Sequence, residues 1–376
     1  MTAVTAAETA IAEPDAGVRA RGVSLGRLRM SRSRAIAGAV LLGLGFIPVV
    51  VPHHDFWMYI GAYIAVWAML ELSIVVVTGF AGMISLMPFT FVGIGCFASG
   101  VAVSVWGWPF WLAVPFAAAA TVPVSIAVGA ASVRLKGLYL AIATLTFGNA
   151  LGETLFKWNA FTGGQQGHTI VRPKLGVLSF RGDFSFYVLA MLVALLLVWM
   201  VHGLKASRVG RAMLSVRDNE REAQALGINA IKTKLTALVI GGAIAGVGGA
   251  FYLALLRTAA PAGFQSPYVE ISSVLLVVWA VIGGIDSAFG AFLGATALIV
   301  QQQVYQGVGE RLGAWLGLYA AAILVVFLIT RPGGLVQVVK IQRERIHSDR
   351  IRGGIETFVI LAINVVIVYL ILHFGK

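Results

Sequence analysis

Long apolar stretches alternate with short polar segments along most of the chain. A helix needs about 20 apolar residues to cross a bilayer. On this basis the pattern predicts about eleven transmembrane helices, one or two of them broken or re-entrant, near residues 35–52, 56–78, 88–105, 111–132, 138–156, 184–203, 233–255, 269–285, 288–306, 313–330 and 354–374. The glycine-rich segment 79–87 is too short for a regular span, so a short re-entrant or broken segment is expected there. The predicted fold class is an all-α polytopic membrane protein.

The composition agrees with this pattern. Hydrophobic residues make up 59% of the 376 residues, charged residues only 12%, and the mean hydropathy is +0.89. A soluble domain carries about a quarter charged residues. Glycine, with 44 residues, is abundant, and Gly-x-x-x-Gly spacing lets membrane helices pack closely. The pairs with this spacing are Gly242/Gly246, Gly290/Gly294 and Gly313/Gly317.

The basic residues are distributed unevenly between the loops. With the N-terminus inside, 21 of the 28 Lys and Arg residues fall on the cytoplasmic side and 7 outside, as the positive-inside rule requires. These loops face anionic lipid, which accounts for the net charge of +12 without nucleic acid as a partner. Residues 1–34 lack the apolar core of a signal peptide and predict a basic cytoplasmic tail. Residues 336–376 predict a basic linker and an additional C-terminal transmembrane helix, with Lys376 outside.

One long polar, helix-prone segment, 216–229, stands out between two apolar spans in the predicted cytoplasmic loop 204–232. Asn219 followed by Glu222 has the form of a helix N-cap with a reciprocal partner. Gly227 and Asn229 are residue types that end helices. A short surface helix between two spans is a candidate docking helix for a soluble partner, although a solvated loop helix without a partner explains the same pattern.

The predicted external loop, 157–183, contains the turn-rich run Thr162, Gly163, Gly164 and Gln165. This run predicts contact with an extracytoplasmic partner or a part in gating. A plain connecting loop is the alternative.

Polar side chains inside the apolar segments mark a candidate translocation pathway. A span carries such groups where helices meet or where water enters, so hydrogen bonds between helices are an equal alternative for each of them. The candidates are Ser85, Thr144, Thr146, Asn149, Ser272 and Ser273. A role for the carboxylates Glu71, Glu153 and Glu270 stays open. Glu71, two thirds along its span, fits a place near a headgroup boundary, whereas Glu153 and Glu270 lie at outer span ends.

No catalytic constellation is visible. The sequence has no phosphate-binding loop of the form Gly-x-x-x-x-Gly-Lys-Ser/Thr and no His-Glu-x-x-His zinc motif. Its one cysteine, Cys96, excludes an intrachain disulfide and a Cys-based metal cluster. Asp286 has no second mid-span aspartate with which to share a proton, and is expected to end a helix between the eighth and ninth spans. We therefore expect neither an enzyme nor a metal site.

Six segments resemble, in order, the landmarks of the branched-chain amino-acid ABC importer permeases, and the match is to the longer, M-type subunit. They are the glycine-rich run Gly79 to Gly95, the run Leu135 to Gly148, Thr162 to Gly164, the loop Gly210 to Asn229, Val281 to Gly290, and Arg331 to Leu335. Three features depart from the family pattern: Met87-Pro88, Asp286 in place of a glycine, and the extension 340–376.

The resemblance implies a heteromeric importer in a bacterial or archaeal cytoplasmic (inner) membrane, with 35–335 as the permease domain. Its partners would be a second permease subunit, two cytoplasmic ATPase subunits that bind ATP and Mg, and an extracytoplasmic solute-binding protein. This chain would hold no cofactor. The ATPases would dock on Arg217, Asp218, Glu220, Glu222, Ala223, Leu226 and Gly227. The substrate would be a branched-chain amino acid or a related small solute such as urea, an amide or an organic acid.

Two other classes of function compete with this interpretation. A stand-alone channel or secondary carrier for a small polar solute would need no ATPase. An intramembrane enzyme would need catalytic residues that the sequence lacks.

Overall fold

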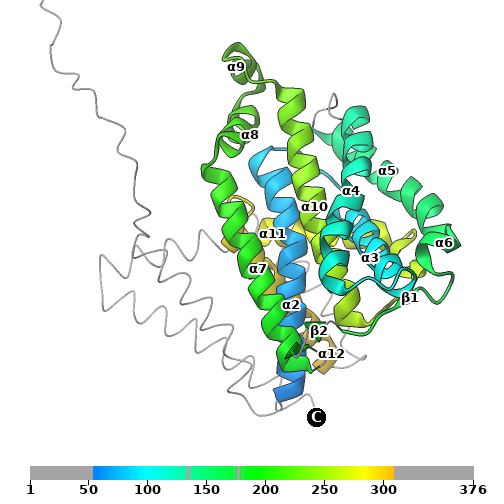
Figure 1. Cartoon of the computed structure of the whole chain (residues 1–376). Helices are drawn as coiled ribbons and strands as arrows, with labels where there is room; N and C mark the ends of the chain where they lie inside the picture. The colour runs from blue at the N-terminus through cyan, green and yellow to red at the C-terminus, as the bar shows by residue number, and fades with distance from the viewer. Residues whose placement is uncertain are drawn as a thin grey trace, which may run out of the picture. The chain divides into compact units, whose positions relative to one another are not determined.

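The computed structural model describes residues 54–308, apart from 133–134, 136, 173, 176–177 and 181. This part of the chain is built almost entirely of helices (Figure 1). They are α2 (His54–Ile74), η1 (Val75–Phe80), α3 (Pro88–Ser104), α4 (Phe110–Ser132), α5 (Leu138–Thr154), η2 (Leu155–Lys157), α6 (Asn159–Thr162), α7 (Asp183–Ala206), α8 (Arg208–Asp218), α9 (Glu220–Ala225), α10 (Ala230–Leu256), η3 (Pro261–Phe264), α11 (Tyr268–Gly283) and α12 (Ala288–Val308). The short strands are β1 (His168–Thr169), β2 (Lys174–Leu175), β3 (Leu178–Ser179) and β4 (Thr258–Ala259).

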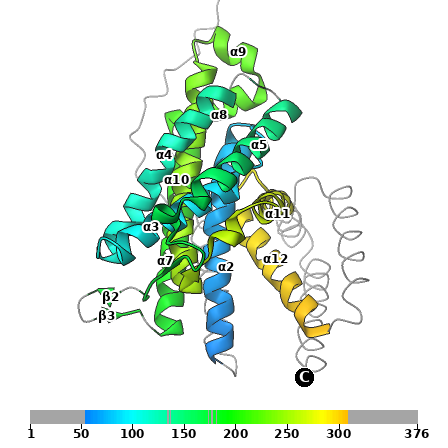
Figure 2. The ribbon, with the colours of Figure 1, turned by 90° about the vertical axis from the view of Figure 1, so that its right-hand side faces the viewer.

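Within these residues, four helices are long and apolar enough to cross a membrane: Phe56–Phe80, Phe110–Ala131, Asp183–Ala206 and Ala230–Leu256. They match four of the predicted spans. Helices α11 and α12 occupy two more, but they are bent by 117° at a short break and together count as a fifth candidate (Figure 2). The multi-pass helical class is confirmed. The predicted spans 35–52, 313–330 and 354–374, the tail 1–34 and the C-terminal extension lie outside the described residues, so the total of eleven stays a prediction.

Two other predicted spans form shorter helices. The third span is α3, an apolar helix of 17 residues, and the fifth is α5, also of 17 residues. At about 1.5 Å per residue, each is roughly 25 Å long, less than the apolar thickness of a bilayer. Both nevertheless begin within a residue of the predicted position.

Helices α2 and α10 form the centre of the bundle (Figure 1). The most apolar windows of these helices are 89% and 72% buried, against 33% for α4 and 39% for α7. Helix α2 packs against α7, α10 and α12, and α10 packs against α3 and α4. Helices α4 and α7 therefore lie at the periphery, where their outward faces carry apolar side chains such as Leu112 and Trp199.

The glycine pairs lie at helix contacts. A methyl group added at Gly242 or Gly246 would overlap α4, at Ser125 Oγ or the carbonyl of Ala117, respectively. Added at Gly290, it would overlap the carbonyl of Gly284, and at Gly294 the carboxyl group of Glu71. The packing role predicted for these two pairs is confirmed. Gly313/Gly317 lies outside the described residues.

The predicted break at 79–87 is also confirmed. Helix α2 continues as the π-helix η1 to Phe80, residues 81–87 are not helical, and α3 begins at Pro88. Proline lacks an N–H, so it suits the first position of a helix. The departure at Met87-Pro88 thus fixes where α3 begins.

Candidate functional site

The surface helix α9 begins with the predicted N-cap. The Asn219 side chain accepts hydrogen bonds from the backbone N–H groups of Arg221 at 3.1 Å and Glu222 at 3.4 Å. Its amide nitrogen donates to the Glu222 carboxylate at 2.6 Å. The reciprocal contact is thus between the two side chains, whereas a capping box uses the cap backbone. The cap predicted from Asn219 and Glu222 is confirmed.

The end of α9 is a Schellman motif. Gly227 has φ +82°, its N–H donates to Gln224 O at 2.9 Å, and the Ile228 N–H donates to Ala223 O at 2.9 Å. The reversal turns Ile228 back onto a small apolar cluster of Val216, Ala223 and Ala230. The sequence suggested Asn229 as a residue that ends this helix, but the structure differs. Asn229 caps the start of α10, because its side chain accepts from the Lys232 N–H at 3.0 Å.

An ion pair joins α9 to α10. Lys234 Nζ lies 3.1 Å from Glu220 Oε2, and the Lys234 side chain is only 9% exposed. Together with the cluster around Ala223, this contact fixes one side of α9 against the membrane-spanning helix.

The opposite side of α9 faces away from the rest of the described chain. Leu226, at the C-terminal end of the helix, is 79% exposed. Asp218, Glu222 and Gly227 are exposed too. Of the predicted coupling residues, these four remain available to a partner, whereas Glu220 and Ala223 hold the helix in place.

Arg217 makes a different contact, directed toward the bundle. Its guanidinium donates to the Gly79 carbonyl at the end of η1, and to Asp286 Oδ1 at 2.6 Å in the break between α11 and α12. Lys205 of α7 donates to the Asp286 carbonyl at 2.5 Å and lies 5.5 Å from the centre of the Phe80 ring. We call this set the helix-end junction: Gly79, Phe80, Lys205, Arg217, Ile285 and Asp286. Asp286 was expected to end a helix, but α11 ends at Gly283 with Gly284 as its C-cap, and Asp286 lies in the break before α12.

Two of the predicted pathway residues bind the backbone at the start of α3. The Leu86 N–H donates to Thr144 Oγ1 of α5 at 3.0 Å, and the Phe89 N–H donates to Ser273 Oγ of α11 at 3.3 Å. The first N–H groups of a helix have no partner within the helix, and the Met87 side chain caps none of them. Ser273 therefore satisfies an N–H group in the first turn of α3, and Thr144 fixes the backbone just before it.

The other pathway candidates are dispersed. Ser85 is buried and lines a small pocket among η1, α3 and α10 with Thr78 and Gly242. Thr146 is exposed and its hydroxyl donates to Ile142 O within α5. Ser272 is half-buried. Asn149 Oδ1 is buried without a hydrogen-bond partner in the described part of the chain. The structure thus brings Thr144 and Ser273 to the same short backbone segment, 86–89, while the pathway itself stays a prediction.

The predicted external run is partly covered. Thr162 is buried and donates to Trp158 O at 3.1 Å, whereas Gln165 is exposed and a methyl group added at Gly164 would meet no other atom. Strand β1 pairs with β4 just after α10, with His168 opposite Ala259. The buried His168 ring also lies 2.8 Å from Ser104 Oγ and 3.1 Å from Phe161 O. These contacts fasten the loop to α3 and to the segment after α10, while Gln165 at its tip stays exposed.

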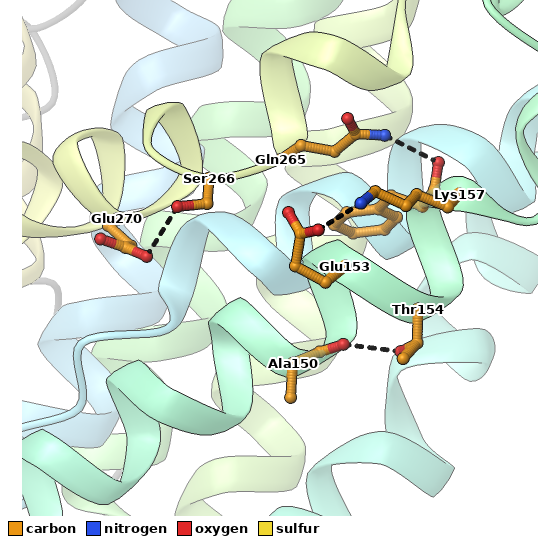
Figure 3. Close-up of polar contacts among 8 residues, drawn as sticks. Ala150, Glu153, Thr154, Lys157, Gln265, Ser266 and Glu270 are labelled. Atoms are coloured by element: carbon orange, nitrogen blue, oxygen red, sulfur yellow. Dashed lines mark hydrogen bonds and ion pairs between the residues drawn. The ribbon is translucent and has the colours of Figure 1, made fainter.

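A polar cluster lies between the end of α5 and the start of α11 (Figure 3). Glu153 forms an ion pair with Lys157. Ser266 donates to Glu270 Oε1 at 3.1 Å, and Gln265 donates to Phe156 O at 3.3 Å. Two of the three carboxylates left open by the sequence, Glu153 and Glu270, therefore bind neighbouring polar groups at helix ends.

Glu71 is different. Its side chain, on α2, is fully buried against Gly294 of α12, and the Ala295 backbone N–H lies beside its carboxyl group. This burial is within the protein, and a place near a headgroup boundary stays a prediction.

Contacts between distant segments follow the predicted sidedness. The helix-end junction joins residues 79, 205, 217 and 286, all assigned to the cytoplasmic side by the loop charges. The contacts of His168 and the β1–β4 pair join segments assigned to the outside. Within the described ranges, no group of three or more His, Cys, Asp or Glu is arranged to hold a metal ion, and Cys96 is buried.

Sequence reasoning missed the partners of Lys234 and Asp286. Lys234 stands within the apolar start of α10, and a cation at such a position signals a buried partner. Asp286 is a departure from the family pattern and was expected to end a helix, not to pair with a cation. The sequence held no signal that pairs it with Arg217.

Comparisons with known proteins agree with these features. The family described as branched-chain amino acid transport system / permease component matches residues 57–329. A high-affinity branched-chain amino acid transport system permease protein, LivM of Salmonella typhimurium, is 28% identical over 312 residues, which cover 77% of this chain and 71% of that protein. LivM of Escherichia coli is 29% identical over 301 residues, covering 74% of this chain and 69% of that protein. No solved structure matches the chain significantly.

Proposed function

Because the chain belongs to the family of branched-chain amino acid transport permeases, we propose that it is a membrane-spanning subunit of an ATP-driven, binding-protein-dependent importer. Its cargo is a branched-chain amino acid or a related small solute such as urea, an amide or an organic acid. Both relatives are named for high-affinity transport of branched-chain amino acids, which supports the first choice.

Helix α9 is held in place on one side and exposed on the other, and this arrangement carries the proposal. The inner side of α9 is fixed by Glu220, Ala223 and the two terminal caps, while Leu226 is 79% exposed. An exposed leucine on a rigid surface helix is a suitable anchor for a protein partner, because a preorganised apolar side chain loses little entropy on binding. Asp218 and Glu222 add polar contacts around it. A partner that binds there can move α9 and the attached helices as one unit.

The energy source acts in trans. The sequence contains no phosphate-binding loop, so two cytoplasmic ATPase subunits hold ATP and Mg²⁺. When these subunits close, α9 moves with them, and the attached helices change the side on which the pathway is open. The solute arrives from an extracytoplasmic binding protein that contacts the loop tip at Gly163, Gly164 and Gln165.

A second permease subunit completes the pathway. The outward apolar faces of α4 and α7 suit contact with that subunit or with lipid, because most of each helix is not covered by this chain. The non-helical segment 81–87 meets α3, α5 and α11 near Ser85, Thr144 and Ser273. An irregular backbone is tolerated at membrane depth where protein buries it or where it lines a water-filled path.

Uptake by reconstituted vesicles tests the proposal. The chain is purified with its native complex, inserted into proteoliposomes and supplied with the binding protein. Uptake of labelled leucine, isoleucine, valine and urea is then measured with and without ATP at the cytoplasmic face. Accumulation of at least one solute only when ATP is present is expected. Equal uptake without ATP, and without any ATPase in the purified complex, would instead indicate a stand-alone channel or carrier.

A further inference from the structure

The helix-end junction connects the docking helix to two breaks in the bundle. Arg217 lies two residues before Asn219, the cap of α9. Its guanidinium binds the end of η1 at Gly79 and the α11–α12 break at Asp286. Lys205 adds a second link to Asp286 through the backbone carbonyl, at 2.5 Å. Both cations thus belong to the helices that lead to α9, and both bind helix ends.

The acceptors at this junction are groups that helices leave unpaired. Carbonyls at the end of a helix lack an N–H partner in the next turn, and Gly79 stands in the last turn of η1. Asp286 lies between α11 and α12, outside both helices. Arg217 and Lys205 supply the missing donors, so the two breaks are held by side chains that come from the cytoplasmic segment.

The fit around the junction is close. A methyl group added at Gly79 would overlap the Ile285 carbonyl, and one added at Gly82 would lie 2.9 Å from Arg217 Cγ. The end of η1, the α11–α12 break and α8 are therefore in direct contact. A displacement of one must displace the others, because packed segments have no free space in which to move separately.

The ion pair of Arg217 and Asp286 is too exposed to matter chiefly for the stability of the fold. Arg217 is 32% exposed and Asp286 is 65% exposed, and ion pairs this open to solvent contribute little to folding. Their geometric effect is larger, because one guanidinium fixes the positions of two helix ends relative to α8.

We propose that Arg217 and Asp286 are positioning residues that transmit movement of α9 to the end of η1 and to the bent pair α11–α12. This inference rests on the proposed function, since it names the route by which the ATPases act. In this route α9 moves two elements at once: α10 through Glu220 and Lys234, and the two breaks through Arg217. The first break, 81–87, leads directly into α3, where Thr144 and Ser273 bind the backbone.

The experiment measures the number of solute molecules taken up per ATP hydrolysed by the complete complex in proteoliposomes. Arg217→Ala and Asp286→Asn should each lower this ratio at least fivefold, while the ATPases still co-purify. The double variant should be no worse than the stronger single variant, because both changes break one contact. Arg208→Ala is the matched control, since it removes an exposed cation of α8 outside the junction. It should leave the ratio within twofold of the wild type.

Hydrogen–deuterium exchange on the complete complex provides the second measurement. Arg217→Ala should speed exchange in residues 81–87 and 284–290 without changing exchange in 230–240, and Arg208→Ala should change neither. An unchanged transport ratio in both junction variants, or unchanged exchange at both breaks, would overturn the proposal. If the wild-type complex takes up solute without ATP, the proposed function fails, and the coupling role fails with it. ATP-dependent wild-type uptake with unaffected junction variants overturns the junction alone.

Discussion

Lys234 of α10 forms its ion pair with Glu220 of α9 from an almost fully buried position, with 3.1 Å between Nζ and Oε2. A buried cation is costly unless a counter-charge satisfies it. The pair therefore determines where α9 sits on the end of α10, and the cap at Asn229 orients the first turn from which Lys234 extends.

Replacing Lys234 with methionine should loosen α9 from α10. Methionine keeps the apolar stem but removes the charge that holds Glu220. Exchange of the backbone N–H groups of 219–228 should become faster, and ATP-dependent uptake should fall several-fold. Lys232→Met, an exposed neighbour on the same helix, is the control and should alter neither. Equal exchange in the two variants would show that the ion pair does not position α9.

The hydroxyl groups that bind the backbone at the start of α3 should contribute measurably to stability. Thr144→Val and Ser273→Ala each leave a backbone N–H without its acceptor, which costs about 1 kcal/mol. The thermal unfolding midpoint of the purified protein in detergent should fall in both variants. Thr146→Val and Ser272→Ala, which change neighbouring hydroxyls that do not bind the start of α3, should have little effect. A midpoint as low in the control variants as in the first pair would contradict the capping role.

Substitutions at two glycines of the external loop distinguish the cost of backbone strain from the cost of a steric overlap. Gly164 and Gly167 have similar positive φ angles, +78° and +72°. A methyl group at Gly164 meets nothing, whereas one at Gly167 overlaps the Ala259 carbonyl of β4. Gly164→Ala should therefore cost only the strain of a left-handed residue, about 1 kcal/mol. Gly167→Ala should also break the β1–β4 pair.

Limited proteolysis from the outer face measures this difference. Cleavage within 163–170 should be much faster for Gly167→Ala than for Gly164→Ala. Similar rates for the two variants would mean that β1 and β4 do not hold the loop.

Local signals in the sequence predicted the helices and their ends well. The break before Pro88 and the cap formed by Asn219 and Glu222 depend on residues within a few positions of one another, so pattern alone shows them. Arg217 and Gly79 are 138 residues apart, and their contact depends on how η1, α8 and the bent pair pack. No spacing rule carries that information, and a polar residue such as Thr144 looks the same whether it lines a path or caps a helix.

The bend between α11 and α12 shows a second limit. Each segment has the apolar length of a span, so the sequence predicts two spans of equal kind. At the 117° bend, Gly283 lies so close to Gly290 and Gly294 that an added methyl group would overlap their backbone, and this proximity exists only in the folded arrangement. The hydrophobic pattern gives the number of apolar segments but not the angle between them.

Docking of an ATPase on α9 predicts that the partner lies against position 226. A photo-crosslinking amino acid placed there, in the complete complex in native membranes, captures this contact. Irradiation should join this chain to an ATP-binding subunit, identified by mass spectrometry. The same amino acid placed at Gln165, in the external loop, should give no such product. Failure of position 226 to crosslink to an ATP-binding subunit while uptake remains ATP-dependent, or a crosslink to that subunit from position 165, would contradict the claim.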